Sequence, residues 1–410
     1  MRSGFKESSI GLIPDDWDVV NLGDIGEFKN GINKSKEDFG HGCPFINLMD
    51  VFGKNEVSPS NLQLVNASEN EVKEFNLMRG DVLFVRSSVK PNGVGLTALV
   101  RENLTNTVFS GFLIRFRDND ILKAEYKRHC FFENGFRKRL IDKSTVSANT
   151  NINQVALKSL LFAIPPKNEQ SKIASILSAV DDKIDAINER ITQTQLLKNG
   201  LMQRLLTKGI GHTKFKDSPL GEIPESWKLI RFEETCKNIS LKYSLLQGRC
   251  IDLEHIEQNT GRIIGYTEIK SSSSSKNHFK PNDILFGKLR PYLRKYWLAE
   301  FEGACTSELL ILRATDGFDP KFLFFLVQQD RFIQNAIVNS FGTKMPRTNW
   351  KAIADYPIAV PSLSEQNKIA EILITENNKL AILKEKKTLY IQLKTGLMQQ
   401  LLTGKIRVKV

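Results

Sequence analysis

The chain has 410 residues, of which 41% are apolar and 25% charged, and 58 Lys and Arg against 46 Asp and Glu give a net charge of +12. This composition suits a globular protein of two or more domains, and the positive charge favours a polyanionic partner. The sequence contains neither a long apolar run nor a secretory signal, so we expect no membrane span and no export. The five cysteines form no CxxC pair, so we expect neither structural zinc nor disulfides, as in a reducing cytoplasm.

The chain opens with a motif that it later repeats. Residues 5–17 read FKESSIGLIPDDW and residues 215–227 read FKDSPLGEIPESW, with seven of 13 positions identical. In both copies Ile-Pro-x-x-Trp places a large ring after a rigid turn. We interpret Trp17 and Trp227 as core anchors, with a ligand-binding role as the alternative.

The segment that follows each opening motif has a mixed, strand-rich pattern. Short β-branched or aromatic runs between turn residues predict strands at 81–85, 109–116, 309–313 and 356–360. Helical patterns cover 122–138 and 320–339, although Gly135 weakens the first. The offset between the copies falls from 210 to 202 to 196 along the chain, so these two segments are the part that diverges.

Polar loops interrupt both segments, at 86–93 and 147–153 in the first and at 270–276, 287–295 and 342–349 in the second. Arg and Lys suit phosphates and guanine edges, whereas Asn can pair with adenine. Solvated loops with no DNA contact have the same composition, and that alternative stays open. The candidate DNA-binding residues are Arg86, Ser87, Ser88, Lys90, Asn92, Asn149, Asn151, Asn153, Lys270, Lys276, Lys288, Arg290, Tyr292, Arg294, Lys295, Lys344, Arg347 and Asn349.

A second repeat is longer and predicts two matched helices. Residues 165–207 and 361–403 align without a gap, with 20 of 43 positions identical. Ile173, Leu177, Val180, Ile184 and Ile187 recur at steps of four and three, which keeps one apolar seam facing a partner helix. At ~1.5 Å per residue, about 39 helical residues span roughly 58 Å. Two matched helices with coiled-coil spacing favour packing against each other, and the alternative is an amphipathic helix packed on a domain core.

No catalytic constellation is found. The chain lacks the GxxxxGK[ST] loop that binds nucleoside triphosphates and the Asn/Asp-Pro-Pro-aromatic motif of amino-methyltransferases. The five histidines have no partners for acid–base work, and acid pairs near a lysine occur by chance at this composition. We therefore expect no enzyme activity from the chain alone, no cofactor and no metal.

The repeated Pro-x-x-x-Glu-Gln-x-x-Ile-Ala, at Pro165 and again at Pro361, resembles the conserved-region signature of type I restriction-modification specificity subunits. The Ile-Pro-x-x-Trp openings, Gly-Asp-Val-Leu-Phe at 80–84 and the Gly-Leu-Met-Gln-x-Leu-Leu-Thr helix ends are similar to that family as well. At 282 the second copy has Asn where Gly80 stands in the first, so the second turn is expected to differ.

This resemblance implies an α+β fold with two pseudo-twofold-related mixed α/β target-recognition domains, joined by two long helices packed as an antiparallel coiled coil. The expected divisions are residues 1–164 and 211–360 for the recognition domains and 165–210 and 361–410 for the spacer helices. The chain is then the DNA-reading subunit of a complex with two methyltransferase subunits and restriction subunits. S-adenosylmethionine, ATP and magnesium are expected on those partners and none on this chain.

Identity within the helix repeat concentrates at its two ends, while the middle diverges. In an antiparallel pair the start of one helix lies beside the end of the other, so one composite surface occurs twice, and we expect each to dock a methyltransferase subunit. Glycine inside a helix costs roughly 1 kcal/mol relative to alanine, which favours close approach of another chain, or of the second helix itself. The candidates are Gln170, Lys172, Lys198, Gly200, Gln203, Gln366, Lys368, Lys394, Gly396 and Gln399.

Two expectations about assembly follow. Because the divergent segments differ, the two halves of the DNA site should differ, with an unread spacer that the helices set. The chain's end should lie beside its beginning, because residue 410 corresponds to 214 and residue 1 to 211 by repeat offset. The rival interpretations are a coiled-coil scaffold that joins two protein-binding modules, and a stand-alone restriction enzyme.

Overall fold

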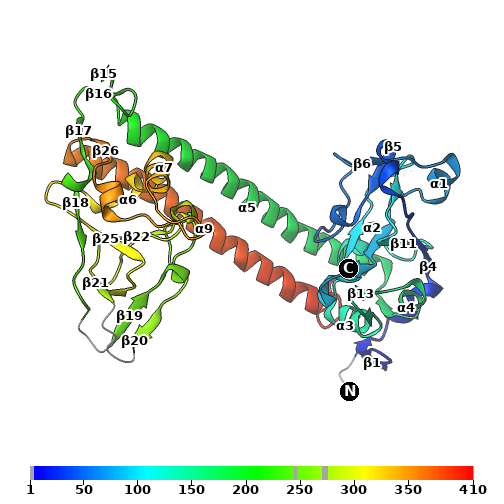
Figure 1. The fold of residues 1–410 in the computed structure, drawn as a ribbon. Helices are drawn as coiled ribbons and strands as arrows, with labels where there is room; N and C mark the ends of the chain where they lie inside the picture. Colours follow the sequence, from blue (N-terminus) through cyan, green and yellow to red (C-terminus); the bar gives the residue numbers. More distant parts are fainter. Residues whose placement is uncertain (1–3, 244–246, 270–275, 410) are drawn as a thin grey trace. The chain divides into compact units, whose positions relative to one another are not determined.

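The computed structural model describes residues 4–243, 247–269 and 276–409. The chain forms two compact units, which are described separately below. The first contains Met1–Asn188 and Lys386–Val410, and the second contains Glu189–Glu385. Each unit therefore combines one α/β domain with one half of each long helix, as the colours in Figure 1 allow the reader to follow.

The main sheet of the first unit has the strand order β4-β11-β7-β9, and all its neighbours are antiparallel. Every residue of β7 is buried, because Val82 and Phe84 face one core while Leu83 and Val85 face another. This explains why the run is continuously apolar rather than alternating. It also confirms the strand predicted at 81–85. The bounds are β4 Gly26–Asn30, β7 Val82–Val85, β9 Thr97–Leu99 and β11 Leu113–Asp118.

The single strand predicted over 109–116 is wrong, since two strands occupy the region. β10 (Val108–Phe109) pairs in parallel with β5 (Phe39–Ile46), and β11 begins only at Leu113. The turn between them contains Gly111, where a Cβ would lie 2.0 Å from Asn33 Oδ1. β6 (Gln63–Val65) completes this second sheet in the order β10-β5-β6.

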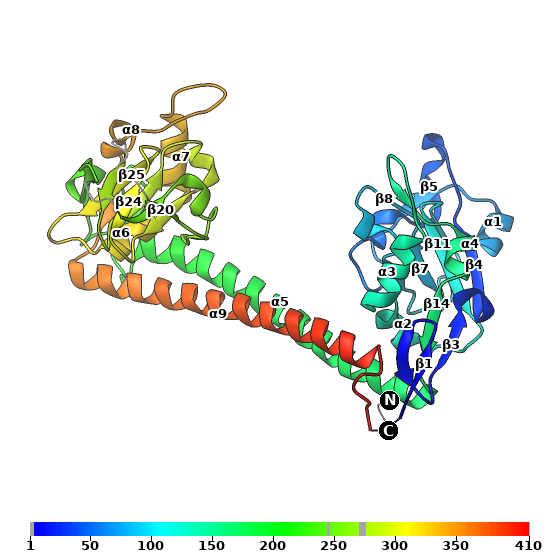
Figure 2. The ribbon, with the colours of Figure 1, turned by 90° about the horizontal axis from the view of Figure 1, so that it is seen from below.

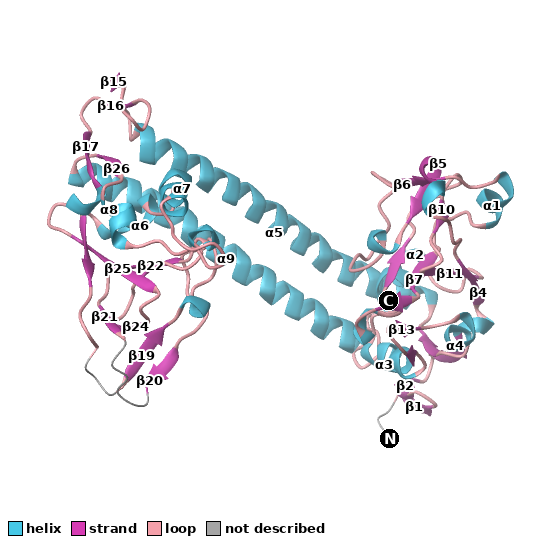
Figure 3. Ribbon diagram, viewed as in Figure 1, coloured by secondary structure: helices cyan, strands magenta, loops and turns pink. Residues whose placement is uncertain are grey.

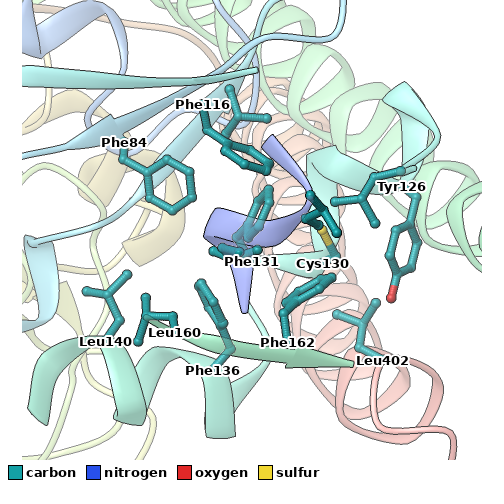
Figure 4. Packing of buried hydrophobic residues seen from close by; sticks show 14 of the residues in the cluster. Phe84, Phe116, Tyr126, Cys130, Phe131, Phe136, Leu140, Leu160, Phe162 and Leu402 are labelled. Atoms are coloured by element: carbon teal, nitrogen blue, oxygen red, sulfur yellow. The ribbon is translucent and has the colours of Figure 1, made fainter. Parts of the chain in front are cut away.

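The helix predicted over 122–138 is also two helices, α2 (Ala124–Cys130) and α3 (Asn134–Asp142). The Glu133 carboxylate accepts hydrogen bonds from the backbone N–H groups of Gly135 and Phe136, which starts a new helix at this point. Phe131 lies in the break and turns inward. Its ring centroid is 5.1 Å from that of Phe84, and Figure 4 shows it at the centre of the aromatic cluster of this core. Two short helices with the buried Phe131 ring between them therefore replace the predicted continuous helix.

The second unit repeats the main sheet in the order β18-β25-β22-β23, and beside it lies a mixed sheet of order β20-β19-β24-β21. The strands predicted at 309–313 and 356–360 are confirmed as β25 (Leu309–Ala314) and β26 (Pro357–Val360). The other bounds are β18 Cys236–Ile239, β19 Gly248–Ile251, β20 Thr267–Ile269, β21 Asn277–Phe279, β22 Ile284–Gly287, β23 Tyr296–Leu298 and β24 Gly303–Cys305.

The helix predicted over 320–339 is again interrupted. α6 (Pro320–Leu326) ends and α7 (Asp330–Val338) begins with Gln329 as its N-cap residue. Figure 3 distinguishes the helices, strands and loops of both units. The smaller elements are β1 Phe5–Ser8, β2 Gly11–Pro14, β3 Asp18–Asn21, α1 Glu69–Glu74, β8 Ser87–Ser88, β12 Thr145–Val146, β13 Thr150–Asn151, α4 Gln154–Lys158, β14 Leu161–Ile164, β15 Phe215–Lys216, β16 Ile223–Pro224, β17 Lys228–Arg231 and α8 Trp350–Ala354.

The two long helices are α5 (Lys167–Lys208, 42 residues) and α9 (Leu363–Leu401, 39 residues). In the first unit Leu177, near the start of α5, shares a core with Leu401 at the end of α9. In the second unit Leu205, near the end of α5, shares a core with Leu373, near the start of α9. The helices therefore run antiparallel within each unit, as Figure 2 also shows, and the predicted pairing is confirmed.

Candidate nucleic-acid interface and docking surface

The repeated tryptophan and the repeated Glu-Gln motif meet in both units. Trp17 Nε1 donates to Glu169 Oε2 at 2.9 Å, and Trp227 Nε1 donates to Glu365 Oε2 at 3.2 Å. Both indole rings are buried, at 0% and 1% exposure. The interpretation of these tryptophans as core anchors is thus confirmed, because each ring ties the domain to the start of a long helix.

In each unit a further side chain, Arg407 or His212, binds the glutamate that accepts from the tryptophan. In the first unit Arg407 binds both Glu169, with Nε 2.9 Å from Oε1, and Asp16, at 2.7 Å. These hydrogen bonds raise the pKa of Arg407 above its usual range. In the second unit His212 Nε2 lies 2.8 Å from Glu365 Oε1. The described end of the chain therefore lies against its opening segment, as the repeat offsets predict.

The two glutamines of the motif do not belong on a docking surface, and this part of the prediction is corrected. Gln170 and Gln366 are each 1% exposed. The Gln170 side chain accepts from Lys123 N and donates to Pro165 O. Gln366 repeats the pattern, accepting from Asp319 N and donating to the carbonyl of the proline that opens its repeat. Their buried amides bond within the chain and fix the start of each helix to its domain.

The two polar loops of the first unit come together in one small sheet. β8 pairs with β13, with Ser87 opposite Asn151, and β13 pairs with β12, with Asn151 opposite Thr145. Arg86 leads into this sheet, and its Nη1 donates to Gly111 O at 3.2 Å. Lys90, Asn92 and Asn149 are exposed at its edges. Segments about 60 residues apart in the sequence thus present their side chains at one place.

The second unit builds the same arrangement from different residues. Arg347 forms isolated antiparallel β-bridges with Leu289 and with Phe341. By repeat offset Leu289, Arg347 and Phe341 correspond to Ser87, Asn151 and Thr145, respectively. The same backbone pairings therefore carry different side chains in the two units.

Several predicted basic residues of the second unit are used within the chain. Arg347 Nε lies 3.1 Å from Glu308 Oε2, and Arg294 pairs with Asp330. Lys288 and Lys295 donate to the carbonyls of Ser307 and Leu253, each at 2.5 Å. Lys344 is exposed, as is Tyr292 at 49%, whereas Arg290 and Lys276 are half-buried. Lys270 lies outside the described residues.

Two candidate DNA contacts are instead helix caps. Asn153 Oδ1 accepts from Ala156 N at 2.8 Å and begins α4. Asn349 Oδ1 accepts from Ala352 N at 2.9 Å and begins α8. The N-cap bond satisfies a backbone donor that the helix leaves free, which explains these asparagines without DNA. Ser88 is also mostly buried, at 8% exposure, so it belongs to the scaffold of the loop.

The helix glycines face open space. A Cβ placed on Gly200 or Gly396 would meet no atom of the described residues within 4 Å. Close packing between the two helices therefore does not explain them. Each follows an exposed leucine three residues earlier, Leu197 at 53% and Leu393 at 49%. Of the other docking candidates, Lys172, Lys368 and Gln203 are exposed and Gln399 is half-buried.

The two lysines of the docking list lie between the helices and are corrected as well. Lys394 Nζ is 2.6 Å from Asp181 Oδ1, which joins α9 to α5 in the first unit. Asp181 is also 3.7 Å from Arg128 and 3.9 Å from His129, both on α2. Burial first, and then Lys394 and Arg128, lower the pKa of His129 to about 3. The sequence did not predict this cluster, although Asp181, a charged residue next to Val180 of the apolar seam, is a sign of it.

Lys198 occupies the equivalent position in the second unit, at 6% exposure. The residue that corresponds to Asp181 in the second unit is Asn377. Burial and the nearby Lys384 lower the pKa of Lys198 to about 8. The repeat has thus kept the lysine and lost its carboxylate partner.

Two further features bear on the chemistry of the chain. Within residues 4–243, 247–269 and 276–409, no group of three or more His, Cys, Asp or Glu side chains could hold a metal ion. Over the same ranges, no helix has the length and apolarity needed to cross a bilayer.

These features define a duplicated binding protein with unlike loop clusters on a common scaffold. The family model for the type I restriction modification DNA specificity domain matches residues 14–195 and 256–391. The specificity subunit of the type I restriction enzyme MjaVIII of Methanocaldococcus jannaschii is 24% identical over 431 residues, covering 100% of this chain and 97% of that protein. The EcoDI specificity subunit of Escherichia coli is 23% identical over 390 residues, covering 88% and 81%.

A solved structure shares the fold. The type I restriction-modification S subunit from M. genitalium has a TM-score of 0.55 at 15% identity, covering 94% of this chain and 96% of that one. The chain belongs to the family of type I restriction-modification DNA specificity proteins. Its function is therefore sequence recognition of DNA as the specificity subunit, which is the non-catalytic component of these systems.

Proposed function

We propose that each unit reads one half of an asymmetric bipartite DNA site, and that the paired helices set the unread spacer between the halves. The proposal rests above all on the repeated loop scaffold. Ser87 faces Asn151 in the first unit as Leu289 faces Arg347 in the second, so one backbone frame presents two unlike side-chain sets. A net charge of +12 supports contact with a polyanion.

The helices also offer a surface for two methyltransferase subunits. It consists of Leu197 and Gly200 in one copy and Leu393 and Gly396 in the other, all exposed. An exposed glycine beside an exposed leucine lets the backbone of a partner approach closely while the leucine is buried. Because the pair occurs once in each unit, two copies of one partner would dock on equivalent surfaces.

Chemistry is assigned to the partner subunits. S-adenosylmethionine belongs to the methyltransferase, and ATP with magnesium belongs to the restriction subunits, while this chain supplies recognition. A cytoplasmic location fits these partners and the five buried free cysteines.

A domain exchange tests the reading of half-sites. Residues 1–150 are replaced by the equivalent segment of another specificity subunit, and the methylated motif is determined by single-molecule sequencing of cells that also express the methyltransferase. One half of the motif should change while the other half and the spacer stay. Changes in both halves would contradict the proposal. Absence of salt-dependent duplex binding by the complex would favour the alternative of a scaffold for two protein-binding modules.

Substitutions at the glycines test the docking surface. Gly200→Trp and Gly396→Trp together should abolish co-purification of the methyltransferase, because the side chain fills the approach path. Gly200→Ala should leave co-purification intact or weaken it only slightly, and should stabilise the helix by about 1 kcal/mol. Ala186→Trp, at an exposed position in the middle of α5, is the matched control. If the double tryptophan variant still co-purifies with its partner, the surface is wrongly placed.

A further inference from the structure

Each unit carries the same two-part device at its loop cluster. The first part is a single 3-10 turn that begins with proline, Pro91–Gly93 in one unit and Pro291–Leu293 in the other. A basic residue precedes each proline, Lys90 and Arg290 respectively. The second part is the hairpin whose base is the Thr145–Asn151 or the Phe341–Arg347 pair.

In both units, backbone hydrogen bonds join the segment that leads into the turn to the hairpin. In the first, Ser87 pairs with Asn151, and Ile152 N donates to Arg86 O at 3.0 Å. In the second, Thr348 N donates to Lys288 O at 2.9 Å, and Arg290 N donates to Pro346 O at 2.7 Å. Ile152 and Thr348 are equivalent by repeat offset, as are Arg86 and Lys288 by the offset of the preceding strands. The side chains at the turn and at the hairpin tip are therefore presented from one conserved frame.

The turn in the second unit is held in a strained conformation. Arg290 and Arg294 flank it with φ of +50° and +51°, a left-handed region that costs a non-glycine residue roughly 1 kcal/mol or more. Lys90, which precedes the proline of the turn in the first unit, has φ of −102°. The Arg294 carbonyl accepts from Asn259 N at 3.0 Å, and its guanidinium pairs with Asp330. These bonds hold the strained turn and leave Tyr292 at its centre 49% exposed.

The chemistry of the presented side chains differs sharply between the units. The first presents amides, Asn92 in the turn and Asn149 at the hairpin tip, beside Val146 at 76% exposure. The second presents Tyr292 in the turn and Lys344 at the tip. An amide forms paired bonds with adenine and an apolar group contacts the thymine methyl, whereas lysine donates to guanine O6 and N7. The basic residue before each proline is common to both units and therefore suits a phosphate, which carries no sequence information.

We propose that the turn and the hairpin tip carry the base-reading residues of each unit, and that the first unit reads an A·T pair through Asn149 while the second reads guanine through Lys344. This inference rests on the proposed reading of one half-site by each unit. It names the residues and the bases that the proposed function leaves open. A bidentate or charged contact of this kind discriminates against the wrong base by roughly ten- to hundredfold.

Methylome sequencing of the complete system tests the assignment. Cells express the full chain with its methyltransferase, as wild type, Asn149→Ala or Lys344→Ala. Asn149→Ala should relax one A·T position in one half-site by about tenfold or more, and Lys344→Ala one guanine in the other half. Asn119→Ala in the first unit and Lys321→Ala in the second replace exposed residues of the same types away from the device, and they should leave the motif unchanged.

The outcomes separate this inference from the proposed function. A wild-type motif that is not bipartite would overturn the proposed function. A bipartite motif in which the Asn149 variant relaxes a G·C pair, the Lys344 variant relaxes an A·T pair, or both variants relax the same half overturns only the assignment of residues to bases. If a variant abolishes methylation through misfolding, the wild-type motif still decides, because the assignment requires an A·T pair in one half and guanine in the other.

Discussion

Lys198 offers the sharpest test of the packing between the long helices. It is 6% exposed, and burial together with Lys384 lowers its pKa from 10.5 to about 8. A drop of that size corresponds to about 3 kcal/mol of unfavourable free energy when the lysine is charged in the folded state. The equivalent lysine in the first unit, Lys394, has Asp181 at 2.6 Å, whereas Asn377 stands at the matching position for Lys198.

The Asn377→Asp variant should restore the missing carboxylate. At pH 7 the second unit should gain up to about 3 kcal/mol, and its melting temperature should rise by roughly 5–10 °C. Lys198→Met should also stabilise this unit, because it removes the buried charge. Combining the two changes should give less stability than Lys198→Met alone, since the new carboxylate would then lack a cation. Thermal denaturation with hydrogen exchange of helix segments 189–208 and 363–385 measures each effect.

The pH dependence gives a second readout. Below pH 8 Lys198 is charged in both folded and unfolded chains, so its cost is constant there. As the pH rises from 8 to 10.5, the folded protein releases the proton first and the cost disappears. The advantage of Asn377→Asp over wild type should therefore shrink across this window. An advantage that is absent at pH 7, or that does not change between pH 8 and 10.5, would refute the reasoning, as would a Lys198 pKa near 10.5 measured by NMR of its ammonium group.

Three further predictions concern the first unit. Glu169→Gln should cost about 2 kcal/mol, because it removes the charged acceptor that Trp17 and Arg407 share, and chemical denaturation of the unit measures this loss. Asp181→Asn should cost about 3 kcal/mol by leaving buried cations without their carboxylate, and hydrogen exchange in residues 386–401 would report it; unchanged protection there counts against the pair. His129 has a folded pKa of about 3, so the stability that it contributes is present above pH 6.5 and falls on acidification, by about 2 kcal/mol at pH 5. In thermal melts at different pH values, His129→Asn should reduce the loss of stability between pH 6.5 and 5. An unchanged slope of stability against pH would contradict the buried neutral state of His129.

The candidate site was recognisable only in part from the sequence. The loop positions at 86–93, 147–153, 287–295 and 342–349 were identifiable by composition, and the structure brings them together in pairs. Composition could not separate an exposed reader such as Asn149 from a helix cap such as Asn153, because both are polar residues in a polar loop. That distinction depends on whether a backbone N–H lies within reach of the amide, and hence on where the next helix starts.

The duplicated framework, in contrast, follows from the amino-acid sequence alone. Heptad spacing and the alignment of residues 165–207 with 361–403 are local properties, so they specify two long helices whatever surrounds them. Other features required the folded chain. In the folded chain Gln170 is buried and bonded to the Lys123 backbone, and Lys394 pairs with Asp181. The helix predicted over 122–138 is interrupted where Glu133 caps α3 and Phe131 enters the core. Each of these outcomes depends on a partner far away in sequence or on a side chain that competes for backbone hydrogen bonds. The spacing of apolar residues along the chain predicts neither.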